Sequence, residues 1–171
     1  MQTSKSRKLM LLFLTTALVL AFYATASLAQ GKVKVKTRAY AVVTERERFE
    51  VGDTPGHFMS ILQNKGVTSD GKFVRYFTTR NDLIKGNGTL SGYGKYVEVK
   101  DGDAMFLKFD GSVSTIKSPE GKLKITFKGP YSYTKGTGKY ENIQGGGTFS
   151  GGYIGEGIIS VDVEGEYIIK K

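Results

Sequence analysis

The chain has 171 residues, no cysteine, and 25 Lys and Arg against 16 Asp and Glu, which gives a net charge of +9. The lack of cysteine excludes disulfides, cysteine-ligated zinc and a cysteine nucleophile, so that packing and hydrogen bonds alone must hold the fold. A chain of this length is typical of one domain with one core.

The first 29 residues have the three parts of a secretory signal peptide in the required order. Lys5, Arg7 and Lys8 form a positive start. An apolar run over residues 9–23 follows, and the small residues of Ala26 to Ala29 match a signal-peptidase site. The run is shorter than the roughly 20 residues that a membrane-spanning helix needs. We therefore expect cleavage near Ala29 and a secreted protein, extracellular or periplasmic.

The remaining residues, 30–171, form the expected single domain and show the two-residue alternation of β-strands without a sustained helical period. Strands are expected at residues 32–41, 57–62, 73–79, 89–99, 104–109, 122–128, 148–154 and 158–169. Asn87-Gly88 predicts a two-residue hairpin, and Asn64-Lys65-Gly66 predicts a bend. About eight strands separated by turn signals predict an all-β fold, a closed antiparallel barrel.

Basic residues alternate with apolar ones at the start of this domain, at Lys32, Lys34, Lys36 and Arg38. Without the three basic residues of the signal, the net charge falls to +6. An excess of positive charge of this kind is compatible with contact with an anionic surface. Charges that alternate with valines are more typical of the water-facing side of a strand, which is the interpretation we favour, and no nucleic-acid partner is expected.

Glycine is abundant, with 23 in the chain, and it recurs in a pattern near the C-terminus. The structural glycine motif comprises Gly136, Gly138, Gly145, Gly147 and Gly151. Aromatic residues such as Phe149 and Tyr153 lie between these glycines at strand spacing, which argues against a flexible linker. Glycines within strands allow the bulges and bends that close a barrel.

The segment from Tyr133 to Gly152 resembles the glycine-aromatic hairpin of the allene oxide cyclase and dirigent barrels. It is closer still to a group of uncharacterised secreted bacterial proteins of the same barrel type, which Gly56-His57 and Thr78-Thr79-Arg80 also match. The resemblance covers Val51 to Lys171 and implies an eight-stranded, calycin-like barrel with a central cavity. Plant barrels of this type often form trimers, so the resemblance is compatible with a homo-oligomer. Their functional polar residues have no one-to-one match here, so the resemblance implies no catalytic residue.

Four residues are candidates for lining the cavity, namely His57, Arg75, Tyr96 and Glu98. His57 is the only histidine, and one histidine is a poor start for a metal site or a serine triad; a hydrogen-bonded structural role is favoured. Glu98 shares a strand face with Tyr96, and it would be a candidate acid or base with a raised pKa if that face points inward. No metal or cofactor is expected.

Two further motifs favour structural interpretations. Gly66 to Lys72 has the spacing of a phosphate-binding loop, but Phe73 stands where Ser or Thr is needed and strands follow, so a hairpin turn is expected. Asp162, Glu164 and Glu166 lie two residues apart in the last predicted strand. A cation site would suit such a row, but the water-facing side of a strand is more typical.

The sequence contains no complete catalytic set, and it favours a non-enzymatic barrel that binds a small apolar molecule in its cavity. One alternative is an isomerase or cyclase that acts through a group such as Glu98 or His57. A second alternative is a structural or surface-interaction protein. An outer-membrane barrel is disfavoured because several strands carry charges at positions that would meet lipid, and because the chain ends in Ile168-Ile169-Lys170-Lys171 rather than on an aromatic residue.

Overall fold

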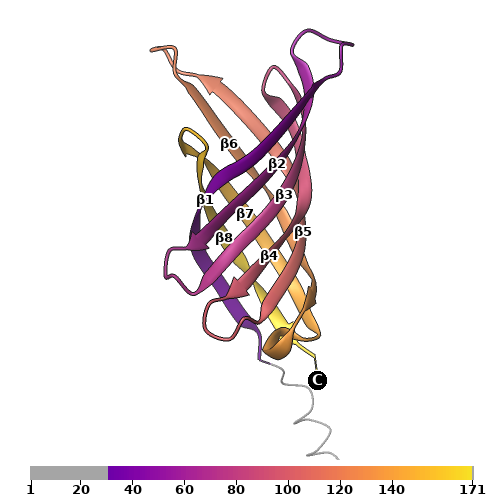
Figure 1. Ribbon diagram of the computed structural model, residues 1–171, viewed down its shortest axis with the longest axis vertical. Helices are drawn as coiled ribbons and strands as arrows, with labels where there is room; N and C mark the ends of the chain where they lie inside the picture. Colours follow the sequence, from indigo (N-terminus) through magenta and orange to yellow (C-terminus); the bar gives the residue numbers. More distant parts are fainter. Residues whose placement is uncertain (1–30, 171) are drawn as a thin grey trace, which may run out of the picture. The chain divides into compact units, whose positions relative to one another are not determined.

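A computed structural model describes residues 31–170, and the expected signal peptide lies outside them. Eight strands, β1 to β8, each pair with the next in antiparallel fashion, and β8 pairs with β1 (Figure 1). The strands are β1 Val33–Glu50, β2 His57–Thr68, β3 Phe73–Ile84, β4 Asn87–Glu98, β5 Ala104–Lys117, β6 Leu123–Gly136, β7 Ile143–Gly155 and β8 Ile158–Ile169. The predicted closed antiparallel barrel is confirmed. No helix within residues 31–170 is long and apolar enough to cross a membrane.

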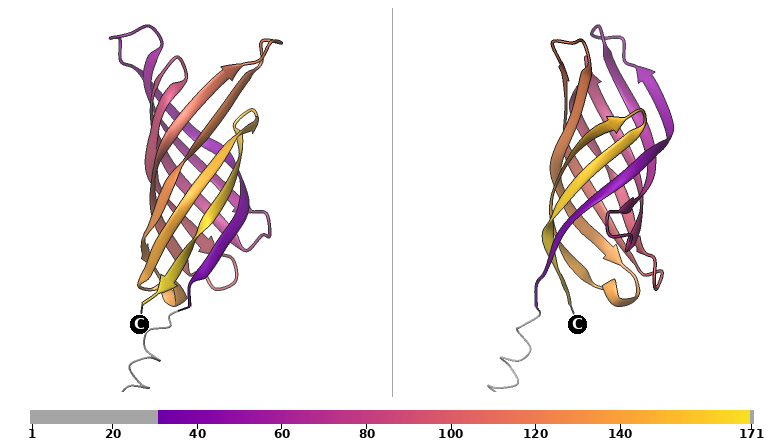
Figure 2. Two further views of the ribbon diagram at one scale, coloured as in Figure 1. Left: turned by 180° about the vertical axis from the view of Figure 1, so that it is seen from behind. Right: turned by 90° about the vertical axis from the view of Figure 1, so that its left-hand side faces the viewer.

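The two ends of the barrel differ in what they carry (Figures 1 and 2). One end carries the β2–β3, β4–β5 and β6–β7 connections, together with the start of β1 and the end of β8. A single 3₁₀ turn, η1 Gly138–Tyr140, lies in the β6–β7 connection at this end. The other end carries the β1–β2, β3–β4, β5–β6 and β7–β8 hairpins. The first is called the closed end and the second the open end.

The strands are longer than the sequence predicts because turn-type residues lie inside them. Asn64-Lys65-Gly66 does not bend the chain; it continues β2 and pairs with β1. Gly66 is needed because β1 passes very close: a Cβ at Gly66 would lie 1.9 Å from the backbone oxygen of Tyr40. The predicted bend was wrong, since the glycine serves strand packing rather than chain reversal.

The predicted hairpin at Asn87-Gly88 was displaced by two residues. The turn between β3 and β4 is Lys85-Gly86, both with positive φ (51° and 79°), which is typical of a type I′ hairpin. Asn87 begins β4 and pairs with Ile84. Its side chain secures the turn, because Nδ2 donates to the Lys85 oxygen and Oδ1 accepts from the Thr115 amide. The predicted turn before Phe73 is confirmed, since β2 ends at Thr68.

Charged residues on β1 and β8 face outward and pair with each other. Lys36 contacts Glu164 at 2.9 Å, and Arg38 contacts Asp162 through two hydrogen bonds of 2.7 and 3.0 Å. Lys32 and Glu166 form a third pair at 2.6 Å. Lys34, which lies between Lys32 and Lys36 in the chain, is exposed on the same face. Both rows therefore occupy the outer face of the barrel, as the alternation predicts.

The glycine motif lies where chain segments approach closely. Gly147 and Gly151 of β7 point toward the interior, and a Cβ at either would lie 1.9 or 2.2 Å from a backbone oxygen of β8. Gly136 and Gly138 flank the 3₁₀ turn, and Gly145 faces the end of β8. The glycines thus let neighbouring strands cross at short range, which a tightly coiled barrel requires.

Candidate functional site

Aromatic side chains fill the closed end of the barrel. Their rings meet mostly edge to face: Tyr140 against Tyr167 at 6.2 Å, Tyr133 against Tyr167 at 5.9 Å, and Phe73 against Tyr96 at 6.2 Å between centroids. The 3₁₀ turn places Tyr140 at this end, where the residue is 7% exposed. Burial raises the pKa of the Tyr140 phenol to about 12, so that it stays neutral as its packing requires.

Glu98 belongs to this closed end. It shares the inward face of β4 with Tyr96, but Lys139 of the 3₁₀ turn reaches it in an ion pair, and the Tyr140 hydroxyl donates to it at 3.4 Å. Lys139 also bridges to Asp101 at 2.9 Å, and its pKa is raised by both carboxylates. Glu98 does not line the cavity, and its partners lock η1 onto the end of the barrel.

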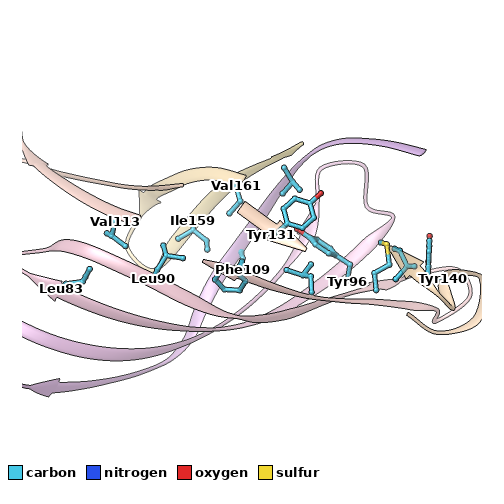
Figure 3. Packing of buried hydrophobic residues seen from close by; sticks show 14 residues of the cluster. Leu83, Leu90, Tyr96, Phe109, Val113, Tyr131, Tyr140, Ile159 and Val161 are labelled. Carbon is cyan, nitrogen blue, oxygen red and sulfur yellow. The ribbon is translucent and has the colours of Figure 1, made fainter. Parts of the chain in front are cut away.

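The other half of the interior contains a cavity of about 660 Å³. Its wall is largely apolar, and the lining residues labelled in Figure 3 include Leu83, Leu90, Phe109, Val113 and Ile159. The lining reaches the Lys85-Gly86 and Glu156-Gly157 turns, which lie between the strands of two hairpins at the open end. The cavity therefore opens at that end and stops at the aromatic cluster.

Glycines of β4 shape the wall of this cavity. Gly92 and Gly94 stand at inward positions, so the rings of Phe77 and Phe109 can pack against the bare backbone. A Cβ at Gly94 would lie 2.5 Å from the Phe77 ring, and one at Gly92 would lie 2.7 Å from the Phe109 ring. The two ring centroids lie 5.6 Å apart, and both rings line the cavity.

Polar side chains are concentrated on β2 and β3, on one side of the cavity. Ser60, Asn64, Arg75 and Asn81 are all buried and all line it. Asn81 Nδ2 donates to Ser60 Oγ at 3.1 Å, and Arg75 Nη2 donates to Asn64 Oδ1 at 3.4 Å. The inward faces of β4 to β8 are mainly aliphatic and aromatic, so the cavity has one polar side and a broad apolar one.

Arg75 lies at the floor of the cavity, directly above the aromatic cluster. The residue is 4% exposed, and its guanidinium lies 4.1 Å from the centre of the Phe77 ring. Its neighbour across the strands is Tyr96. Burial lowers the pKa of Arg75 and raises that of Tyr96, while the charge of Arg75 opposes the second shift. Nε and Nη1 of Arg75 are buried without a hydrogen-bond partner.

Tyr131 of β6 adds a second polar group to this floor. Its hydroxyl is buried and has no partner within hydrogen-bond geometry. Burial raises the pKa of the phenol, the nearby Tyr133 hydroxyl opposes that shift, and Tyr96 adds a smaller rise. Figure 3 shows Tyr131 next to Tyr96 in the interior of the barrel. Arg75, Asn64, Tyr96 and Tyr131 together make a polar floor beneath an apolar chamber.

The structure separates the four sequence-predicted candidates. Arg75 and Tyr96 line the cavity, Glu98 lies beyond its floor, and His57 is outside the barrel wall. His57 contacts Asp82 of β3 at 2.8 Å through Nε2 and Asp53 of the β1–β2 loop through Nδ1. No cluster of three or more metal-ligating side chains occurs within residues 31–170.

Sequence reasoning missed Asn64 and Tyr131 at the floor, and Arg46 and Arg48 at the mouth of the cavity. The register of β1 against β2 shifts between Val43 and Glu45. Val43 lines the cavity before this bulge, and Arg46 and Arg48 line it after, so the extra residue changes which positions face inward. The only signal in the sequence for this change of inward face is that Glu45 to Arg48 alternate in charge, with no row of apolar residues between them.

Comparisons of the chain with protein-family models, with curated proteins and with solved structures found no match. The resemblance to allene oxide cyclase and dirigent barrels therefore stays a prediction, and the residues of the cavity carry the functional argument.

Proposed function

We propose that this protein binds a small, largely apolar molecule in the barrel cavity without catalysing a reaction. The observation that carries the proposal is the cavity of about 660 Å³, which is closed at one end, open at the other and walled mainly by apolar side chains. Its volume lies within the range of about 300–1,000 Å³ that is typical of small-molecule sites. A barrel of eight strands has room for one such ligand only where its side chains leave the lumen unfilled.

The outer face of the barrel supports a binding role in water. Three ion pairs lie on the β1–β8 surface, and lysines flank Tyr76 on its exposed face, with Lys65 and Lys95 lying 5.4 and 5.1 Å from the ring centre. A membrane-embedded barrel would instead carry a continuous apolar band on the outside. The distribution of charge is that of a wall that faces solvent on the outside and an apolar ligand on the inside.

We further propose that the protein acts outside the cytoplasm, after removal of residues 1–29. The support is the three-part N-terminal pattern of the sequence. Expression of the full chain in a secreting host and N-terminal sequencing of the product should give a chain that begins at Gln30. A product that retains Met1 or residues of the apolar run would contradict this proposal.

The binding proposal is tested on the secreted product of the full chain, purified without detergent, by native mass spectrometry and by calorimetric titration with dodecan-1-ol. Wild-type protein should bind one molecule of the alcohol. Leu90→Trp places a large ring in the cavity and should abolish binding. Tyr93→Trp is the matched control on the same strand, because Tyr93 is 68% exposed on the outer face, and it should bind as the wild type does.

Each outcome separates the functional alternatives. No binding by the wild type, or equal binding by both variants, would refute the cavity as the site and favour a structural or surface-interaction role. Solvent extraction of the purified protein adds a second reading, since a molecule that co-purifies at one per chain would reveal the natural class of ligand. A molecule recovered in chemically altered form would support an isomerase or cyclase instead.

A further inference from the structure

The buried side-chain atoms of residues 31–170 that lack a hydrogen-bond partner belong to two residues that line the same cavity. Among the described residues, three buried side-chain atoms have no hydrogen-bond partner: Nε and Nη1 of Arg75, and the hydroxyl oxygen of Tyr131. Both residues line the cavity. A buried polar group without a partner is costly, and a buried charge without a counter-charge is more so. The side chains of the barrel therefore leave the Arg75 guanidinium without an acceptor for two of its donors.

The neighbours of Arg75 meet only part of this demand. Asn64 accepts one hydrogen bond at 3.4 Å, and the Phe77 ring covers one face of the guanidinium. Neither supplies negative charge, and no carboxylate forms a salt bridge with Arg75 within residues 31–170. Glu98, whose side chain faces inward from β4, is paired with Lys139 at the closed end. The guanidinium keeps free N–H groups on two different edges, at Nε and at Nη1, and a charged donor of this kind suits an oxyanion such as a carboxylate.

We propose that the ligand is an apolar molecule that carries one carboxylate, and that Arg75 binds this carboxylate at the floor of the cavity. This inference rests on the proposed binding function and names the class of ligand. The hydroxyl of Tyr131 donates a further hydrogen bond to the bound acid group. The body of the ligand extends toward the open end between the apolar faces of β4 to β8.

The mouth of the cavity supports the same sign of charge. Of the charged residues that line the cavity, four are basic (Arg46, Arg48, Lys85 and Arg75) and one is acidic (Glu156). Arg48 pairs with Glu50 at 2.7 Å, and Arg46 contacts only the neutral Tyr153 hydroxyl at 3.5 Å. A cationic rim above an apolar chamber attracts anions and raises the rate at which they arrive. The acid group thus meets positive charge first at the mouth and again at the floor.

The test compares dodecanoate with dodecan-1-ol, two ligands of matched chain length, on the same secreted product at pH 8. The wild type should bind dodecanoate at least about tenfold more tightly than the alcohol, the effect of a charge-assisted hydrogen bond. Arg75→Met keeps the length of the side chain and removes its charge. It should lose at least about tenfold in affinity for dodecanoate and keep its affinity for dodecan-1-ol.

Arg80→Met is the matched control, because Arg80 lies on the same strand and is exposed on the outer face. It should keep the wild-type preference for the acid. Equal affinity of the wild type for the two ligands would overturn the inference while leaving the binding function intact. A preference that survives in Arg75→Met would also overturn it and would assign the acid group to the basic mouth. Failure of both ligands to bind would instead refute the proposed function.

A second measurement needs no variant. In complex with the wild type, ¹³C-carboxyl-labelled dodecanoate should show a carboxyl pKa below that of the free acid, because a guanidinium stabilises the ionised form. An unchanged or raised carboxyl pKa in the complex would place the acid group away from Arg75 and overturn the inference.

Discussion

At the closed end of the barrel, tyrosine and phenylalanine rings meet across the interior, whereas near the open end the same strands leave a cavity. β4 shows the difference within one strand. Tyr96 packs against Phe73 and Phe77, but Leu90, six residues away on the same inward face, borders open space. Alternation decides which residues face inward, and their size decides whether the lumen is filled.

This contrast assigns different tasks to the two ends. The closed end holds the 3₁₀ turn, the Glu98–Lys139 ion pair and most of the edge-to-face ring contacts. These interactions stabilise the fold and leave no room for a ligand. The open half leaves a cavity of about 660 Å³ between its side chains. We therefore expect mutations at the closed end to change stability, and mutations in the open half to change binding.

The largest effect is expected from Tyr140→Ala at the closed end. The residue is 7% exposed and contacts Phe73 and Tyr167, so its truncation leaves a void that these neighbours cannot fill. The loss should be about 3–5 kcal/mol in the free energy of unfolding, measured by urea denaturation. Tyr93→Ala on the exposed face of β4 is the control and should cost less than about 1 kcal/mol. Similar losses for both variants would show that the closed end is not the stabilising half.

Enlarging side chains should separate the two halves in a second way. Met105→Trp inserts extra volume into the filled closed end and should destabilise the fold by about 1–3 kcal/mol, the usual cost of overpacking. Leu90→Trp adds volume where a cavity is available and should cost less. Urea denaturation of both variants checks the order. A larger loss for Leu90→Trp would mean that the open half closes up in solution.

Arg75→Met should stabilise the ligand-free protein. The substitution removes a buried guanidinium that lacks a counter-charge and replaces it with an apolar chain of similar length. A gain of about 1–3 kcal/mol in the free energy of unfolding is expected, with Arg80→Met as the neutral comparison. A loss of the same size in the free energy of unfolding would indicate that the contacts of Arg75 with Asn64 and Phe77 stabilise the fold, and would argue against a role in ligand binding.

The sequence was sufficient for the kind of fold because alternation is a local property. Valines and alanines that alternate with Lys34 and Lys36 indicate a strand with one wet face, and eight such segments indicate a barrel. The ends of the strands were harder to predict from the sequence. Gly66 is typical of a turn in isolation, yet it lies in β2 because β1 passes within contact distance. A close approach between strands that are distant along the chain leaves no local signature.

For a related reason, only part of the candidate site could be predicted from the sequence. Arg75, Tyr96 and Glu98 were recognised as candidates, but the face of each strand that points inward depends on the register of its neighbours. His57 and Phe58 are adjacent in β2, and only Phe58 lines the cavity. Glu98 points inward but meets Lys139, which comes from a turn about forty residues later. Long-range register and loop placement, which the sequence does not display, decided both outcomes.

The smallest effect concerns His57 at the open end, where it joins the β1–β2 loop to β3. Hydrogen bonds to Asp82 and Asp53 raise the pKa of His57 above its ordinary value of 6.5, and His57 lowers the pKa of Asp53 below 3.8. The imidazolium contribution is therefore complete below pH 6.5 and is lost as the pH rises through the raised pKa of His57. The Asp53 contribution is present above pH 3.8 and is lost as the pH falls through the lowered pKa of Asp53.

The contact of the β1–β2 loop should thus be strongest in mildly acidic solution. An NMR titration of the His57 ring should give a midpoint above 6.5, and Asp82→Asn should return it toward that value because it removes the largest cause of the shift. Lys85→Met, at the neighbouring turn, is a control that keeps both carboxylates and should leave the His57 midpoint raised. A wild-type midpoint at or below 6.5 would show that the two aspartates do not hold the imidazolium, and that the open end lacks this link between the loop and the barrel wall.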